Sequence, residues 1–247
     1  MYGRIVHLQP LCWGADGWPQ IGQRLNDTGK GQPVSLHRLP ALPVAPCCLQ
    51  TSDDFRHGQP GVQWQWQANP QRHWLTPHQQ GLRLRCALTS GDISLYRLPQ
   101  LLLQKFPAER FDVQTAVDPM FSQDGDEAGI AIYGQRFAAL CVTYRAANLQ
   151  LALCHGWIDD RGETHQQSIG LEEVSGCKEI ELGFQVDYDG VVHFRYRLAQ
   201  REWRQVTPQF SAGAGKWIGA RMGIYARGER ENVKGSAIFS PFIVRLQ

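Results

Sequence analysis

The side chains in this sequence with the most obvious chemical potential are carboxylates that occur in clusters. Hydrolysis of a glycosidic bond needs two carboxyl groups about 5–9.5 Å apart on either side of a cleft. Neighbouring residues of a strand point to opposite faces, and the clusters lie at turn signals, where Asp accepts local hydrogen bonds. We therefore interpret the clusters as turn residues and assign no catalytic residue to this chain. They are Asp53-Asp54, Asp124 with Asp126 and Glu127, Asp159-Asp160, and Glu172-Glu173.

Motifs for metals and cofactors are missing from the sequence. The seven cysteines include the neighbours Cys47 and Cys48 but no C-x-x-C pair, whereas zinc sites use closely spaced ligands. Residues 124–127 offer oxygen ligands for calcium but lack the long loop with ligands at alternate positions. No zinc-protease, nucleophile-elbow or phosphate-loop motif occurs. We expect no metal and no cofactor, and we expect the cysteines to be small buried thiols in a reducing cytoplasm.

Tryptophans are the other residues that could contact a ligand. Trp64 and Trp66 lie two residues apart, between glutamines, so both indoles point to one face of a strand. Together with Trp74 they could stack on sugar rings while the glutamine amides bind hydroxyl groups. Large aromatic side chains more commonly fill a core. Packing in the core is the interpretation that we favour, and a sugar platform is the alternative.

The composition limits the class of protein. The 247 residues carry a formal net charge of +2, which argues against a dedicated nucleic-acid binder. Hydrophobic residues make up 43% and charged residues 19% of the chain, which excludes extensive disorder. No apolar run reaches the ~18 residues of a membrane span, and the N-terminus has no leader pattern. We expect a cytoplasmic protein that binds neither nucleic acid nor membrane.

The elements that must position these residues are predicted to be strands. Residues 180–188 alternate between apolar and polar, and 192–198 continue the pattern after Asp189-Gly190, which favours a β-hairpin with a two-residue turn. No segment of ~12 residues has a helical period. Many short strands without helices between them indicate an all-β, two-sheet antiparallel sandwich. The other predicted strands are 82–87, 92–97, 111–118, 128–133, 138–145, 148–155, 220–226 and 236–246.

The beginning of the chain differs from the rest. Residues 2–22 predict a short hairpin around Gly14–Gly17, with Trp13 and Trp18 on its two arms. Residues 23–51 contain a loop at Asn26–Gly31 and then recurring prolines, Pro33, Pro40, Pro43 and Pro46, which suits an extended strap. We therefore divide the chain into a hairpin at 1–22, a proline-rich linker at 23–51 and a sandwich domain at 52–247.

Several motifs resemble glycoside hydrolase family 43, the family of many β-xylosidases and arabinofuranosidases. The N-terminal segments resemble the last strands of the family's five-bladed catalytic propeller, and the later ones resemble its C-terminal concanavalin-like jelly roll. The family's Asp-Tyr-Phe run near the end is Ser240-Pro241-Phe242 here, so no ion site is expected there. The matching segments, in the family's order, are Tyr2–Pro10, Asp16–Gly22, Asp53–Phe55, Gly61–Trp66 with Asn69-Pro70, Gly81–Leu84, Leu102–Phe106, Asp124–Ile130 and Ile218–Tyr225.

The resemblance implies a function for this chain and also implies that the family's catalytic acids lie outside it. The family hydrolyses xylose- or arabinose-containing oligosaccharides in one inverting step between two carboxyl groups. Its catalytic acids lie in propeller blades that precede the segment matching Tyr2. This chain is therefore expected to be inactive alone, and to act as an accessory sandwich that completes the active-site wall. Its expected partners are the sugar and a propeller domain, or a neighbouring copy that covers the N-terminal hairpin.

Two substrate-binding residues follow from the resemblance alone. Gly3-Arg4 matches a Gly-Arg whose guanidinium reaches the family's sugar pocket, and a planar guanidinium can donate two hydrogen bonds to neighbouring hydroxyls. The loop Gly213–Gly219 matches one that closes the pocket with an aromatic side chain, and Trp217 stands where the family usually has Phe. The competing interpretation is structural: Arg4 pairs with a carboxylate and Trp217 covers a sheet edge.

Two other functions stay open for the sandwich. It could be a free-standing, lectin-like module that binds carbohydrate through Trp64, Trp66 or Trp74. It could also be a structural or oligomerisation module without a ligand. An exposed aromatic row favours binding, whereas burial of these indoles between the sheets favours the accessory or structural role.

Overall fold

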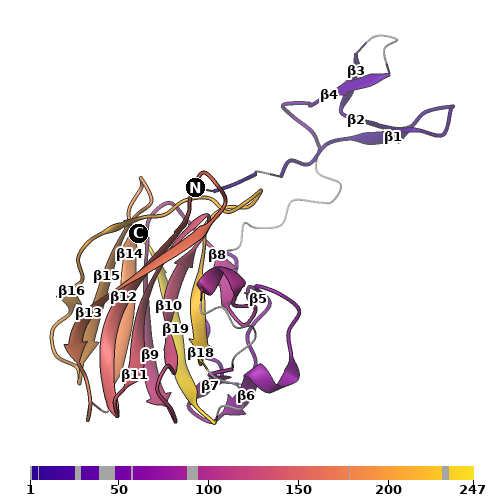
Figure 1. Ribbon diagram of the computed structural model, residues 1–247. Coiled ribbons are helices and arrows are strands. Elements are labelled where there is room, and N and C mark those ends of the chain that lie inside the picture. The colour runs from indigo at the N-terminus through magenta and orange to yellow at the C-terminus, as the bar shows by residue number, and fades with distance from the viewer. Residues whose placement is uncertain are drawn as a thin grey trace. The chain divides into compact units, whose positions relative to one another are not determined.

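The computed structural model describes residues 2–4, 6–25, 29–38, 48–56, 58–87, 94–177, 179–229 and 234–247. The chain divides into a large unit, residues 1–3 with 49–247, and a small unit, residues 4–48. The large unit is a sandwich of two antiparallel sheets (Figure 1). This confirms the predicted all-β fold, and no α-helix occurs in the described residues.

The first sheet has the strand order β13-β12-β11-β10-β18-β8-β5, and the second has the order β16-β15-β14-β9-β19-β7-β6, with β17 beside β15. Strands that neighbour each other in space, such as β10 and β18, are far apart in sequence, as in a jelly roll. The strands of the first sheet are β5 (Gln65–Trp66), β8 (Leu102–Lys105), β10 (Glu127–Tyr133), β11 (Arg136–Arg145), β12 (Asn148–Ile158), β13 (Thr164–Glu173) and β18 (Arg221–Arg227). Those of the second are β6 (Leu75–His78), β7 (Gly81–Arg85), β9 (Phe111–Met120), β14 (Ile180–Val186), β15 (Val191–Leu198), β16 (Arg204–Gln205), β17 (Phe210–Ser211) and β19 (Ser236–Leu246).

The hairpin of β14 and β15 shows how the apolar pattern builds the core. Every second residue from Ile180 to Val186 is fully buried and belongs to the main core cluster between the sheets. The predicted two-residue turn is wrong, because the strands end at Val186 and resume at Val191. The amide of Gly190 donates to Asp187 O over 2.8 Å, and Gly190 has φ +74°. Tyr188 therefore lies in the turn, 62% exposed, and is not part of the apolar face.

A second apolar cluster covers the other face of the first sheet. It joins Leu95, Leu98 and Leu101 to small residues of β10–β12, such as Ala131 and Cys141. Leu95–Arg97 form a short 3-10 helix, η3, capped by Ser94. The strand predicted at 92–97 is therefore wrong for residues 95–97, and 92–93 lie outside the described residues. No helix in the described part of the chain is long and apolar enough to span a bilayer.

Strand β13 was not predicted. Its ten residues, THQQSIGLEE, carry no alternation of apolar and polar side chains, and most of them are exposed. It pairs with β12 at the edge of the first sheet, with a register shift between Leu151 and Ala152. An edge strand with solvent on both faces has no reason to show the period that marks a half-buried strand.

The small unit contains two hairpins. Strand β1 (Leu11–Trp13) pairs with β2 (Pro19–Ile21), as predicted for this segment. Strand β3 (Gln23–Leu25) pairs with β4 (Lys30–Gln32), so the proline-rich linker predicted from residue 23 does not begin there. Residues 26–28 of the predicted loop, and Pro40, Pro43 and Pro46 of the predicted strap, lie outside the described residues.

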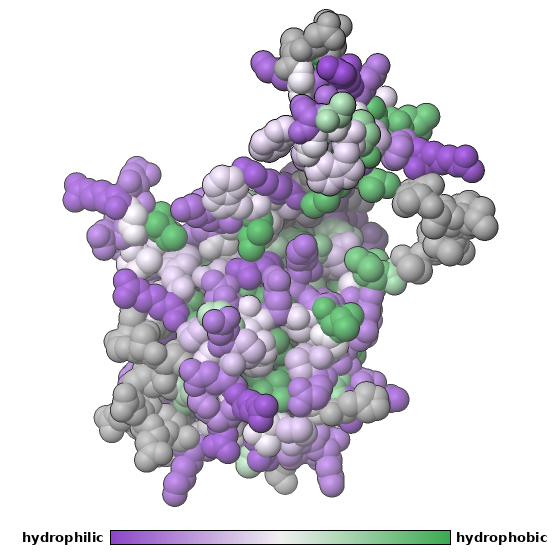
Figure 2. Space-filling model, turned by 90° about the vertical axis from the view of Figure 1, so that its right-hand side faces the viewer, coloured by the Kyte–Doolittle hydropathy of each residue, from purple (hydrophilic) through white to green (hydrophobic). Residues whose placement is uncertain are grey.

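The surfaces of the two units differ. Over the sandwich face seen in Figure 2, hydrophilic residues predominate and apolar residues are scattered. The small unit exposes large apolar side chains on its three-residue strands: Leu11 is 53%, Trp13 70% and Ile21 56% exposed. A hairpin of this length without a core is marginally stable in water.

We expect this difference to appear in amide hydrogen exchange. In the dilute chain, the amides of β1–β4 should exchange much faster than those of β10–β12, which lie between two apolar clusters. Exchange followed by mass spectrometry would measure both segments in one experiment. Strong protection of residues 11–25 in the monomer would contradict the prediction.

Candidate functional site

The residues that link β17 to β18, 212–220, form what we call the Trp217 loop. Strand β17 pairs with β15 in the second sheet, and β18 belongs to the first sheet, so this loop crosses the end of the sandwich from one sheet to the other. Its first amide, Ala212 N, donates to Gly190 O over 2.9 Å. In the middle, Gln135 N donates to Ala214 O over 3.0 Å. The loop is therefore attached to turns of both sheets.

Trp217 itself has an unusual backbone. Its φ is +73°, a conformation that costs a bulky L-residue about 1–2 kcal/mol. Its side chain is 61% exposed, so burial of the indole does not compensate for this cost. A backbone outlier of this kind persists only where the surrounding structure holds it, and such outliers are concentrated at functional sites. Trp217 thus combines a positive φ with a largely exposed indole in the loop at the end of the sandwich.

The third attachment of this loop comes from the start of the chain. Gly3 forms an isolated antiparallel bridge with Ile218. Gly3 has φ +72°, and a Cβ atom there would lie 2.2 Å from Gly219 N, so only glycine fits this contact. Tyr2 and Ile218 on either side of the bridge are 42% and 41% exposed.

Arg4 follows Gly3 directly and is exposed, and it is the first residue of the small unit. The structure thus places Gly3 beside the Trp217 loop. Arg4 is part of the small unit. Of the two predicted substrate-binding residues, Trp217 is located within the large unit.

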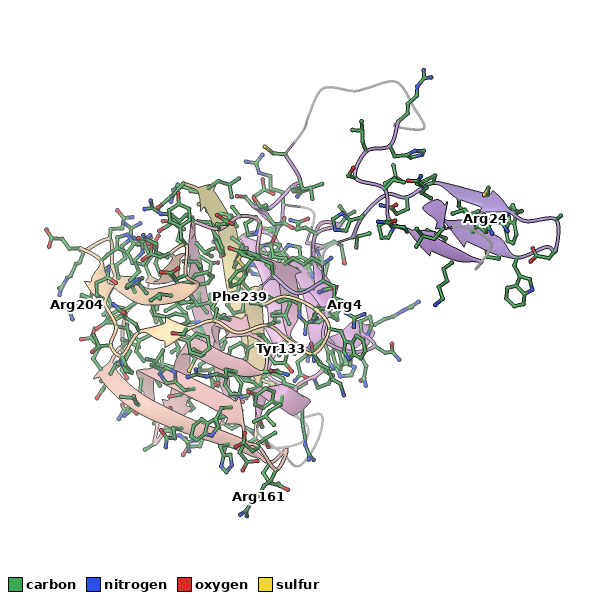
Figure 3. The ribbon with its side chains drawn as sticks, turned by 90° about the horizontal axis from the view of Figure 1, so that it is seen from above. Arg4, Arg24, Tyr133, Arg161, Arg204 and Phe239 are labelled. Carbon is green, nitrogen blue, oxygen red and sulfur yellow. The ribbon has the colours of Figure 1, made fainter. Side chains whose placement is uncertain are left out.

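A polar network lies on the first sheet close to the strand that follows this loop. Arg221, the first residue of β18, donates to Gln67 Oε1 over 2.7 Å, and Gln67 Nε2 donates to Tyr133 Oη over 3.1 Å. The guanidinium also lies 5.2 Å from the centre of the Tyr133 ring. Burial raises the pKa of Tyr133 and lowers the pKa of Arg221. Figure 3 labels Tyr133 among the strands of the sandwich.

Sequence reasoning did not identify this network. Gln67 and Arg221 are 154 positions apart in the chain, and neither stands in a motif with a known spacing. The sequence offered one weak indication of this network: Arg221 lies in the segment Ile218–Tyr225 that resembles the family, directly after this loop.

The acidic clusters serve local structure. Asp53 is buried, and its carboxylate accepts hydrogen bonds from Phe55 N, Gly61 N and Trp64 Nε1, each within 2.8–2.9 Å. Asp126 is fully buried and accepts from Ser122 N and Gln123 N; burial raises its pKa, and these bonds act in the opposite direction. Donors from the chain itself therefore bind both oxygens of Asp53 and Oδ2 of Asp126, as expected for turn residues, whereas Oδ1 of Asp126 is buried with no hydrogen-bond partner among the described residues. The turn interpretation is wrong for Glu127, which begins β10, and for Glu172 and Glu173, which end β13.

Among the described residues, no group of three His, Cys, Asp or Glu side chains is arranged to hold a metal ion. The thiols of Cys86, Cys141 and Cys154 are buried and unpaired by disulfides. Burial raises the pKa of all three, that of Cys154 to about 12. They are thus protonated at neutral pH and poor nucleophiles. Cys12 and Cys48 are exposed, so the expectation of buried thiols is wrong for these two, and Cys47 lies outside the described residues.

The tryptophans proposed as an alternative sugar platform lie mostly inside the protein. Trp64 is 8% and Trp74 1% exposed. The ring of Trp64 packs edge-on against Phe242, 4.9 Å between centroids, and Trp66 packs partly buried against the core cluster. Trp64 and Trp74 therefore offer no open ring face to a sugar, because protein covers them.

The comparisons with known proteins point to one family. Residues 52–245 match the family described as the β-xylosidase C-terminal concanavalin A-like domain; the match starts where we expected the sandwich to start. A relative from Xylanibacter ruminicola named for β-xylosidase activity is 27% identical over 223 residues, covering 90% of this chain and 39% of the relative. A β-xylosidase of Formosa agariphila is 24% identical, covering 93% of this chain and 41% of the relative.

Solved structures share the fold. A family 43 protein from Bacillus licheniformis superposes with a TM-score of 0.72 at 22% identity, covering 99% of this chain and 47% of that chain. A xylan β-1,4-xylosidase from Bacillus halodurans gives a TM-score of 0.68 at 19% identity, with 96% and 46% covered. The chain thus spans less than half the length of the relatives that it matches.

Proposed function

Because this chain belongs to the family of β-xylosidase C-terminal concanavalin A-like domains, we propose that it works as the accessory C-terminal domain of a glycoside hydrolase that acts on xylan- or arabinan-type oligosaccharides. In this proposal the sandwich adds a wall to an active site whose catalytic carboxylates belong to a propeller domain. Trp217 is the residue of the sandwich that meets the sugar, and Arg4 is a second contact.

The observation that carries the proposal is the state of Trp217: 61% exposed at φ +73°. Backbone outliers at bulky residues are concentrated at functional sites, and a positive φ at a largely exposed Trp supports a binding role for it. A flat indole suits the apolar face of a sugar ring, and excluding water from one side of the site strengthens the electrostatic interactions within it. For Arg4 the support is the resemblance alone: a guanidinium there would donate hydrogen bonds to sugar hydroxyls.

The proposal assigns a limited part of the reaction to this chain. In single-step inverting hydrolysis one carboxylic acid protonates the leaving oxygen while a carboxylate activates water on the opposite face of the ring. The buried Asp53 and Asp126 are engaged in holding turns, and we assign neither role to them. The chain would orient the substrate, and it contributes no proton transfer.

The free-standing carbohydrate-binding alternative relied on stacking of sugars on Trp64, Trp66 or Trp74. The burial of Trp64 and Trp74 argues against binding through these two indoles. A cytoplasmic location stays a prediction from the sequence.

We expect the pure chain to show no turnover of aryl xylosides or aryl arabinofuranosides, because general acid–base catalysis needs two positioned carboxyl groups. A fusion in which the catalytic propeller of a family member precedes the chain should hydrolyse at least one of these substrates. The fusion with its propeller carboxylates replaced serves as the control. Turnover by the chain alone would show that it carries a catalytic pair that we have not recognised.

A further inference from the structure

The strained backbone of Trp217 requires that the loop around it be held. Contacts among the described residues that hold it include Ala212 N to Gly190 O, Gln135 N to Ala214 O, and the bridge between Gly3 and Ile218. All three join backbone atoms at both ends. The second depends on Gln135, in the turn between β10 and β11, whose own position can be traced to a side chain.

The turn and the Trp217 loop approach each other closely. A Cβ atom on Gly134 would lie 2.1 Å from Gly213 O, so the two backbones are in direct contact. The hydrogen bond from Gln135 N to Ala214 O closes this contact at 3.0 Å. A shift of Gln135 would therefore move Ala214, which lies in the loop three residues before Trp217.

Tyr96 holds Gln135 from the other side. Its hydroxyl donates to Gln135 O over 2.5 Å. Its ring packs edge-on against Phe137, with centroids 5.0 Å apart, and it lies 6.0 Å from the ring of Tyr133. Burial raises the pKa of Tyr96, so the hydroxyl keeps its proton and remains a donor at neutral pH.

The backbone of Tyr96 is itself fixed. It is the central residue of η3, and Ser94 Oγ accepts from its amide over 3.3 Å. Its neighbour Leu95 is fully buried in the second apolar cluster, and Leu98 is 6% exposed. Tyr96 thus connects η3, whose leucines pack on the first sheet, to Gln135, and Gln135 connects to the loop.

We propose that Tyr96 is a positioning residue, which holds Trp217 in place through the two backbone hydrogen-bonding groups of Gln135. The inference rests on the proposed function, because in that function the position of Trp217 affects substrate binding. Tyr96 itself makes no contact with the sugar in this proposal. Its effect on catalysis passes through the Trp217 loop.

The test on the isolated chain is Tyr96→Phe, which keeps the ring packing on Phe137 and removes only the hydroxyl. We expect the amides of residues 213–219 to exchange about 2- to 10-fold faster, the range for loss of one hydrogen bond in a local opening. Trypsin should cleave after the exposed Lys216 faster by a similar factor. Unchanged exchange and cleavage would overturn the proposal.

Tyr225→Phe is the matched control, because it removes a hydroxyl that donates to Glu127 over 2.6 Å on the same sheet, away from the loop. It should lower global stability and leave local exchange at 213–219 unchanged. If it accelerates exchange in the loop as much as Tyr96→Phe does, the effect is global and the proposal is wrong.

Activity in the propeller fusion separates this inference from the proposed function. Tyr96→Phe should lower kcat/KM in the presence of Trp217 and have no further effect in a Trp217→Ala background. An equal loss in both backgrounds would overturn the positioning role. Faster loop exchange with unchanged kcat/KM would uphold the attachment of the loop by Tyr96 and contradict the role of Trp217 at the active site.

Discussion

Replacing Glu127 by alanine is expected to lower the free energy of unfolding by about 3–5 kcal/mol, the cost of leaving a buried charge without its partner. Glu127 and Arg227 are each 8% exposed. The carboxylate accepts from Arg227 Nε over 3.0 Å, from Arg227 Nη2 over 2.9 Å and from Tyr225 Oη over 2.6 Å. Burial alone would lower the pKa of Arg227, but the charge of Glu127 outweighs it and raises the pKa. Alanine would leave the guanidinium charged and unpaired.

Chemical denaturation of the chain would measure this loss, with Glu172→Ala as the matched control. Glu172 also pairs with an arginine, Arg204, over 2.8 Å, but the two side chains are 30% and 51% exposed. Exposed pairs are worth about 0–1 kcal/mol, so the control should change stability little. A double variant, Glu127→Met with Arg227→Met, should recover much of the loss, because it removes both charges. Equal losses of stability in Glu127→Ala and Glu172→Ala would refute the large stabilising effect assigned to the buried Glu127–Arg227 pair.

The second large effect is expected in catalysis. In the propeller fusion, Trp217→Ala should reduce kcat/KM about 5- to 150-fold, corresponding to about 1–3 kcal/mol of transition-state binding. The physical reason is the loss of the indole from the wall of the site, which admits water and removes a surface for the sugar. Kinetics on an aryl xyloside would measure it.

Three variants make this result interpretable. Trp217→Phe keeps an aromatic ring at this position and should keep most of the activity. Trp217→Gly relieves the positive φ and should leave the melting temperature unchanged or higher, while activity falls as in the alanine variant. Tyr188→Ala removes another exposed aromatic of the same sandwich, 62% exposed, and should leave kcat/KM unchanged. A folded Trp217→Ala fusion with full kcat/KM would rule out the proposed contact.

The sequence was most informative where one face of a strand is buried. The alternation in β14 and β15 identified both strands and the side chains that enter the core, from Ile180 to Leu198. Burial on one face imposes a period of two on the residues, and this period can be read without knowing the partner strand. The motifs that resemble the family extended the assignment to the whole sandwich, and the family match at 52–245 confirmed it.

Local patterns failed where a segment owes its conformation to distant neighbours. Strand β13 is mostly polar and exposed, with Ile169 and Leu171 as its apolar residues, and it pairs with the edge that β12 offers. Residues 95–97 form a 3-10 helix because the leucines around them cover the small residues of β10–β12. Neither the pairing nor the apolar surface is visible in the segment itself.

For the candidate site, the sequence determined the residue types and the tertiary structure decided their use. The resemblance singled out Trp217 and Gly3-Arg4. The turn signals predicted turns for the acidic clusters, which is right for Asp124 and Asp160 but wrong for Glu127 in β10 and for Glu172 and Glu173 in β13. Only the folded chain brings Gly3 to Ile218, 215 positions later by residue number, and holds Trp217 at a positive φ. Pairs such as Glu127 with Arg227, 100 positions apart, likewise arise from strand order. Side chains on β10 and β18 meet because the sheet places those strands side by side. This pairing cannot be predicted from the spacing of the residues in the sequence.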